Sequence, residues 1–150
     1  MLPKDLSFLT KLHQLENLQE TGEVGRTKVI PDTQLSNIAY LTQLKVLKLL
    51  SEPEDWNILN TLTNLSYLQV QTATTEVLGA FQHFNTLKVL SFHRLNAIPK
   101  PTRLLSPKIL KVYQYLDIGK IPKFFPEVET LIVAECTSKK LFIDNLSFKI

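Results

Sequence analysis

A six-residue pattern of apolar residues returns about every 22 positions in the middle of this chain, and it constrains the fold more than any other feature. The three clearest copies start 21 and 22 residues apart: Leu44-x-x-Leu47-x-Leu49, Leu65-x-x-Leu68-x-Val70 and Leu87-x-x-Leu90-x-Phe92. A fixed period of this length predicts stacked repeats, each with one short strand and one return segment, because a single repeat cannot bury its apolar side alone.

The residues just before each copy also recur. An apolar residue stands three positions before the copy in Leu41-Thr42-Gln43-Leu44, Leu62-Thr63-Asn64-Leu65 and Phe84-Asn85-Thr86-Leu87. This spacing is helical, so it predicts a short helical turn whose apolar side faces the same core as the strand. A similar word, Leu9-Thr10-Lys11-Leu12, predicts an earlier copy that begins at Leu12.

Three looser copies follow downstream and bring the predicted total to about seven irregular repeats. They begin at Leu110, Val128 and Ile143, after steps of 23, 18 and 15 residues, and the first of them places Tyr113 and Tyr115 on the inward side. Short steps leave little room for a helix, so we expect the return segments to shrink toward the C-terminus. The step from Leu12 to Leu44 is 32 residues, and its surplus predicts a protruding loop in the polar stretch 20–28.

These repeats resemble those of the leucine-rich repeat superfamily, and the resemblance covers nearly the whole chain. The central copies are similar to the short internalin-type repeat, and residues 2–12 are similar to plant receptor repeats, so the subfamily stays open. The resemblance implies an α/β solenoid: an arc with a parallel β-sheet on its concave side and short helical or extended segments on its convex side. The family's buried turn asparagine is absent, because the equivalent positions hold Glu52, Ala73, Leu95 and Cys136. Without that side chain to satisfy backbone groups, we expect an irregular arc.

Composition agrees with one domain over residues 1–150. The chain is 44% hydrophobic and 21% charged, which is neither disordered nor membrane-like, and no apolar run approaches the length of a membrane span. The charged residues Lys4 and Asp5 exclude an N-terminal signal peptide, so we expect a cytoplasmic protein. Repeat-like sequence at both ends suggests a fragment of a longer array, or ends that associate with a second copy. The single cysteine, Cys136, is predicted to be a small buried hydrophobe.

No set of residues in the sequence indicates catalysis. It has no nucleophile elbow, no P-loop, no zinc-protease motif and no paired cysteines, and His13, His83 and His93 lie in different repeats. Glu52, Glu54 and Asp55 are explained by a solvated turn before a helix that begins near Trp56. We therefore predict a chain that is not an enzyme and holds no metal or cofactor.

The candidate binding site follows from strand geometry. Alternate strand residues must point away from the core, and equivalent residues of neighbouring repeats then stand side by side. The predicted partner-binding residues on the concave face are Val46, Lys48, Tyr67, Gln69, Val89, Ser91, His93, Val112 and Gln114. An apolar row with a polar border and a central tyrosine is typical of a protein-binding patch. The alternative is that valine lines this face only because β-branched residues favour strands.

These features favour a non-catalytic protein-recognition or scaffold module. One alternative is a substrate-recognition domain that belongs to a larger effector, receptor or enzyme. Another is RNA or an acidic surface bound through residues 94–123, which hold seven Lys and Arg residues against one Asp, a local charge of +6. The predicted register scatters these cations between strand and convex face, so a nucleic-acid partner is disfavoured.

Overall fold

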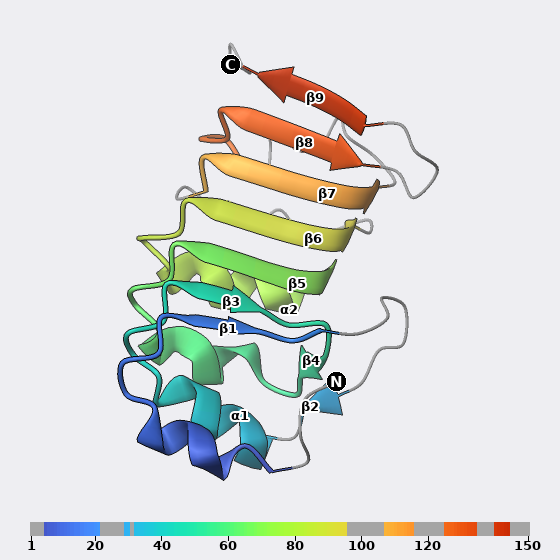
Figure 1. The fold of residues 1–150 in the computed structure, drawn as a ribbon. Coiled ribbons are helices and arrows are strands. Elements are labelled where there is room, and N and C mark those ends of the chain that lie inside the picture. Colours follow the sequence, from blue (N-terminus) through green and yellow to red (C-terminus); the bar gives the residue numbers. More distant parts are fainter. Residues whose placement is uncertain are drawn as a thin grey trace.

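The computed structural model describes residues 5–21, 29–30, 32–95, 107–115, 125–134 and 140–144. These residues form an α/β fold whose main feature is one sheet with its strands in chain order (Figure 1). Its strands are β1 (Asn17–Gln19), β3 (Val46–Lys48), β5 (Tyr67–Ala73), β6 (Val89–Leu95), β7 (Ile109–Tyr115), β8 (Thr130–Ala134) and β9 (Lys140–Asp144). The first six are parallel, as the repeats predict, and β9 pairs antiparallel with β8.

Short helical segments connect the strands of the first half. They are η1 (Ser7–Lys11), α1 (Asp32–Ala39), η2 (Trp56–Thr61), α2 (Thr75–Ala80) and η3 (Phe81–His83), with a minor parallel pair of β2 (Val29–Ile30) and β4 (Glu52–Pro53). Helix α1 packs on η1 and η2, and α2 packs on η2 and η3, so these segments form one layer beside the sheet. The helix predicted near Trp56 is confirmed, and Asp55 caps it by accepting a hydrogen bond from the Asn57 N–H at 2.8 Å.

The core lies between the sheet and the helical layer. One residue of each of the strands β3, β5, β6, β7 and β8 points into it at the same level, and these residues are 0–1% exposed: Leu47, Leu68, Leu90, Leu110 and Leu131. They share a single apolar cluster with helical residues such as Leu59 and Phe81. One face of the sheet is therefore buried against the core. Figure 1 is viewed onto the opposite face, which we call the outer face.

The predicted turn before each central strand is confirmed. In each copy the N–H of the first leucine donates to the carbonyl three residues earlier, for example Leu44 to Leu41 at 2.9 Å, and the same bond occurs at Leu15, Leu65, Leu87 and Val128. The earlier residue is fully buried at Leu41 and Leu62. The recurring four-residue segment, such as Leu41–Leu44, thus forms a single helical turn that buries its first residue and leads into the strand.

Backbone hydrogen bonds reveal a more regular repeat than the sequence predicted. One carbonyl just before each strand accepts two consecutive N–H groups of the next repeat, as the Lys45 carbonyl does from Ser66 and Tyr67 at 2.9 and 3.0 Å. The accepting carbonyls belong to Glu16, Lys45, Ser66, Lys88 and Lys108, which are 29, 21, 22 and 20 residues apart, and Glu129, whose N–H donates to the Lys108 carbonyl, lies 21 residues further on. The long step lies only between the first two copies, and residues 22–28 of its predicted loop lie outside the described residues.

Two predicted copies were therefore placed in the wrong register. Leu110 pairs with Leu90, the second apolar position, rather than with Leu87, the first. The first position of that repeat is Pro107, which is buried but breaks the leucine pattern. Likewise Leu18 pairs with Leu47, so the first copy begins at Leu15 and not at Leu12.

The predicted final copy at Ile143 is also wrong, because Ile143 pairs antiparallel with Leu131 in β9. A parallel repeat cannot continue through a strand of opposite direction. Cys136, the chain ends and the return segments beyond residue 95 lie outside the described residues.

Glu20 accepts hydrogen bonds in a turn, a role that the leucine-rich repeat resemblance assigns to an asparagine. One of its carboxylate oxygens accepts hydrogen bonds from the backbone N–H groups of Leu50 and Ser51 at 2.9 and 2.8 Å, and the other accepts from the Ser51 hydroxyl at 2.7 Å. Ser51 is buried, so these donors would otherwise lack partners. The side chain just after β1 thereby fixes the turn just after β3.

Candidate functional site

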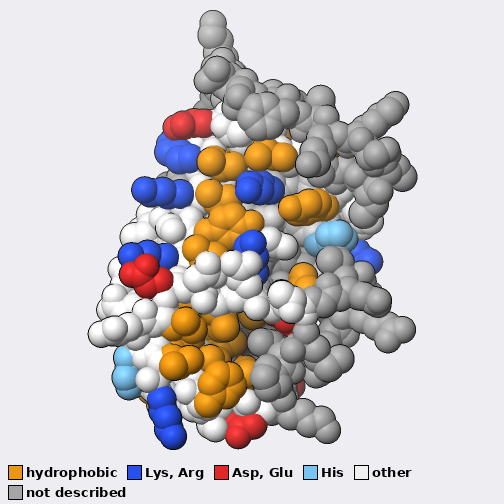
Figure 2. Space-filling view, viewed as in Figure 1, with side chains coloured by type: hydrophobic (Ala, Val, Ile, Leu, Met, Phe, Trp, Pro, Cys, Tyr) orange, Lys and Arg blue, Asp and Glu red, His pale blue; other side chains and the backbone are white. Residues whose placement is uncertain are grey.

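The register assigns the outer-face side chains to three columns that cross the strands. The first column is Asn17, Val46, Tyr67, Val89, Ile109 and Thr130, and the second is Gln19, Lys48, Gln69, Ser91, Lys111 and Ile132. The third column contains His93 beside Tyr113. Most of these side chains are half-buried, so the outer face is partly apolar and accessible. Figure 2 shows hydrophobic side chains with basic ones among them over β5–β8.

Two of the predicted site residues do not belong to this face. Val112 pairs with Phe92, points into the core and is 1% exposed. Gln114 pairs with Arg94 and so is not in the second column. Their predicted places are taken by Ile109 and Lys111, three residues earlier in the sequence. The other predicted residues, Val46, Lys48, Tyr67, Gln69, Val89, Ser91 and His93, stand in the three columns.

Tyr67 lies at the centre of this face. The Lys48 ammonium stands 5.4 Å from the centre of its ring, and the Lys111 ammonium stands 5.5 Å from it. Lys48 comes from β3 and Lys111 from β7, so two cations approach one ring from opposite sides of β5 and β6. Each contact is within the range of a cation–π interaction. The sequence did not predict Lys111 as a site residue, because the predicted register of this repeat was shifted by three residues.

The polar end of Tyr67 is incompletely satisfied. Its hydroxyl donates to the Gln69 side-chain oxygen at 3.2 Å, which is long for this type of bond. Burial raises the pKa of Tyr67, the neighbouring Ser91 hydroxyl opposes the rise, and Tyr113 adds to it. Ser91 is 0% exposed and its hydroxyl is outside hydrogen-bonding geometry to any described residue. Buried hydroxyls in native proteins almost always have a partner, which is a protein group, an ordered water or a ligand.

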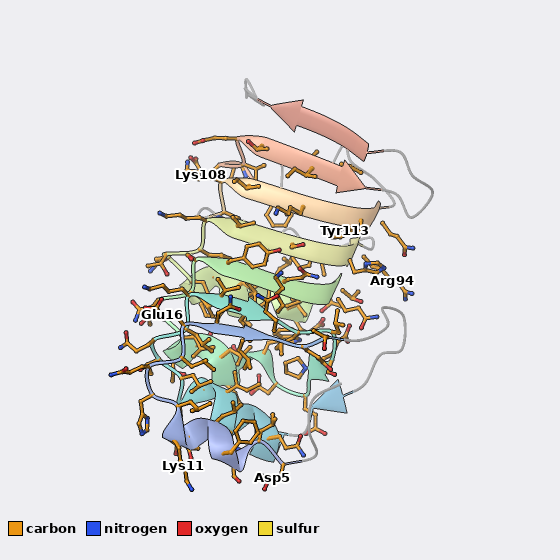
Figure 3. All side chains as sticks on the ribbon, in the orientation of Figure 1. Asp5, Lys11, Glu16, Arg94, Lys108 and Tyr113 are labelled. Carbon is orange, nitrogen blue, oxygen red and sulfur yellow. The ribbon has the colours of Figure 1, made fainter. Side chains whose placement is uncertain are left out.

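A second aromatic pair borders Tyr67. The His93 and Tyr113 rings are stacked with centres 5.7 Å apart and planes 25° apart. Burial lowers the pKa of His93, and the charge of Arg94 lowers it further, so the folded state favours the neutral imidazole. Figure 3 shows Tyr113 over the sheet and Arg94 near the strand ends. The prediction that Tyr113 points inward is wrong for the same reason of register, and the side chain of Tyr115 lies outside the described residues.

Two of the three lysines at the strand starts are paired with carboxylates, unlike the two lysines on the face. Lys45 forms an ion pair with Glu16 at 2.6 Å, and Lys108 forms pairs with Glu127 and Glu129 at 3.3 and 3.2 Å. Lys48 and Lys111 make no ion pair with any described residue. Strands β1, β3, β5, β6, β7 and β8 contain no Asp or Glu at all. The outer face of these six strands is therefore positive, with its two lysines close to aromatic and apolar side chains.

No protein-family model and no curated protein matches this sequence. Its function has to be inferred from the geometry of the outer face.

Other kinds of site have less support in the described parts of the chain. No three His, Cys, Asp or Glu residues are grouped there as a metal site would require. No described helix has the length and apolarity needed to cross a membrane. Of the basic segment 94–123, Lys100, Arg103, Lys120 and Lys123 lie outside the described residues.

Proposed function

We propose that this chain is a leucine-rich repeat solenoid and that it acts as a non-catalytic protein-recognition module through the outer face of its sheet. The strand order, the repeated lead-in turn and the steps of 20–22 residues between the later copies support the solenoid. In such a protein each repeat adds one strand to a continuous surface, and that extended surface is the usual place of binding.

One observation carries the proposal: a half-buried tyrosine at the centre of an otherwise accessible sheet face, with apolar neighbours in its own column. Val46, Val89 and Ile109 stand beside Tyr67 along the first column. Binding energy at protein interfaces concentrates on tyrosine, tryptophan and arginine near the centre of the contact. A β-branched row alone is explained by strand propensity, whereas a central tyrosine with two lysines on its ring is not.

The two alternative functions, substrate recognition within a larger protein and RNA binding, differ in how they relate to this proposal. A substrate-recognition role within a larger protein would use the same face and differs only in what the chain is attached to. RNA binding through residues 94–123 has less support, because Lys108 is already paired with two glutamates. A cytoplasmic location stays a prediction from the sequence.

Affinity capture from an extract of the cells that express the chain tests the proposal. The test variant is Tyr67→Ala with Lys48→Glu, and the matched control is Tyr40→Ala with Lys11→Glu, on the helical layer, where Tyr40 is 66% exposed. Loss of a central tyrosine should weaken binding by about 2 kcal/mol or more, about 30-fold. A partner retained by the wild type and the control but lost from the test variant supports the outer face. Equal retention by all three chains, or loss from the control alone, refutes it.

A further inference from the structure

We infer that the outer face binds an acidic segment of its partner protein, with carboxylate groups bound by Lys48 and Lys111 on either side of Tyr67. This inference rests on the proposed function and adds the chemistry of the partner. It starts from a difference among the cations of this sheet: Lys45 and Lys108 at the strand starts have carboxylate partners within the protein, and Lys48 and Lys111 on the face have none among the described residues.

The positions of the two lysines favour an acidic ligand. Both ammoniums lie within 5.5 Å of the centre of the same ring, from strands on either side. Two like charges drawn toward one point repel each other, and the tyrosine ring offsets this only in part. A carboxylate that binds either ammonium would offset this repulsion, and charge-assisted hydrogen bonds of this kind are stronger than neutral ones.

The polar groups around the tyrosine hydroxyl support the same ligand. The Tyr67 O–H now donates to Gln69 at the long distance of 3.2 Å, and a carboxylate oxygen is a better acceptor than an amide oxygen. The Ser91 hydroxyl lies fully buried close to the Tyr67 hydroxyl and forms no well-aligned hydrogen bond with a described residue. A reoriented tyrosine hydroxyl would then be free to accept a hydrogen bond from Ser91. An anion at this point thus satisfies groups that the chain alone leaves unsatisfied.

The apolar column beside the lysines distinguishes a protein from a nucleic acid. Val46, Val89 and Ile109 are half-buried side chains that gain by contact with apolar groups of a partner. A nucleic-acid backbone carries a charge at every nucleotide and requires a row of cations along its path. Among the described face residues of β3, β5, β6 and β7, only Lys48 and Lys111 supply such charges in the second column. An acidic residue followed by apolar ones in a peptide segment fits this surface better.

Selection from a displayed library of random linear peptides tests the chemistry of the ligand. The wild-type chain is the bait, and binders that also bind the Tyr67→Ala variant are discarded. The remaining peptides should contain Asp or Glu next to apolar residues. Enrichment of apolar or basic peptides without an acidic residue, or no enrichment at all, would overturn the inference.

Fluorescence anisotropy on a selected peptide then tests the two lysines. Lys48→Gln and Lys111→Gln should each weaken binding about tenfold, as should a peptide with Gln or Asn in place of its acid. The control is Lys88→Gln, an exposed lysine at a strand start that lies in neither column, and it should leave affinity unchanged. An equal loss in the control would indicate non-specific attraction and overturn the site. Tighter binding of a single-stranded RNA of equal charge would assign the face to nucleic acid instead.

The same variants separate this inference from the proposed function. If a captured partner is lost on Tyr67→Ala but kept on Lys48→Gln with Lys111→Gln, the face binds protein and the acidic ligand is wrong. If the partner is kept by all of these variants, the outer face itself is wrong.

Discussion

Removal of the Glu20 carboxylate should destabilise the protein more than removal of any exposed acidic side chain. This half-buried group accepts three hydrogen bonds from Leu50 and Ser51, two of them from backbone N–H groups. A hydrogen bond to a charged group contributes about 1.5–3 kcal/mol, but water can reach part of this site and replace some of that energy. We therefore expect Glu20→Ala to lower the free energy of unfolding by about 2–4 kcal/mol.

Urea unfolding and thermal melting measure this effect. For a chain of this length the loss corresponds to about 5–15 °C in Tm. The matched control is Glu16→Ala, whose exposed ion pair with Lys45 should contribute under about 1 kcal/mol. Amide hydrogen exchange gives a local measure, because the Leu50 and Ser51 N–H groups should lose protection in Glu20→Ala while the Leu68 amide keeps it. A loss below about 0.5 kcal/mol with unchanged exchange at Leu50 and Ser51 would refute the role assigned to Glu20.

Three further predictions test the register, the histidine and the inter-repeat contacts. Val112→Asp should unfold the chain or lower the free energy of unfolding by about 4 kcal/mol or more, as measured in urea, whereas Tyr113→Asp should lower it by only about 1 kcal/mol. A larger loss in Tyr113→Asp than in Val112→Asp would support the register predicted from sequence. His93 has a lowered pKa, so its neutral form is favoured in the folded state. Its contribution to stability should be complete at pH values above the pKa of the unfolded state, near 6.5, and should be lost as the pH falls through the lower pKa of the folded state. NMR titration should place the His93 pKa below 6.5 and higher in Arg94→Gln than in the wild type, and equal values would show that Arg94 has no influence. Thr86→Val should cost about 1 kcal/mol in urea unfolding, because the hydroxyl donates to carbonyls of the preceding repeat at 2.7 and 2.8 Å, and no loss would mean that water replaces these bonds.

The sequence predicted the parallel sheet because the period of the leucines records a local requirement. Leu47, Leu68 and Leu90 must enter the same core at the same level, and the residues three positions before each copy must turn the chain into the next strand. Both requirements act within one repeat and its neighbour. They can be recognised from spacing alone wherever the leucines are intact.

The errors in register occur where the local pattern is ambiguous. Pro107 holds the first apolar position of its repeat, so the leucine pattern predicts Leu110 as the start of the copy and assigns the side chains of β7 to the opposite face. A slip of three residues reverses the alternation of a strand. Only the hydrogen bonds that join the Lys88 carbonyl to the Lys108 and Ile109 N–H groups decide between the two alignments.

The chain by itself therefore determined the repeat, the direction of the central strands and the position of Tyr67 on the accessible face, because these depend on residues close together in sequence. The tertiary structure alone decided which side chains surround that tyrosine. Lys48 and Lys111 are 63 positions apart, and they approach one ring only because three consecutive strand pairings bring β3 and β7 to either side of β5 and β6. Contacts of that kind depend on the exact register of every intervening strand, and no spacing within the sequence specifies it.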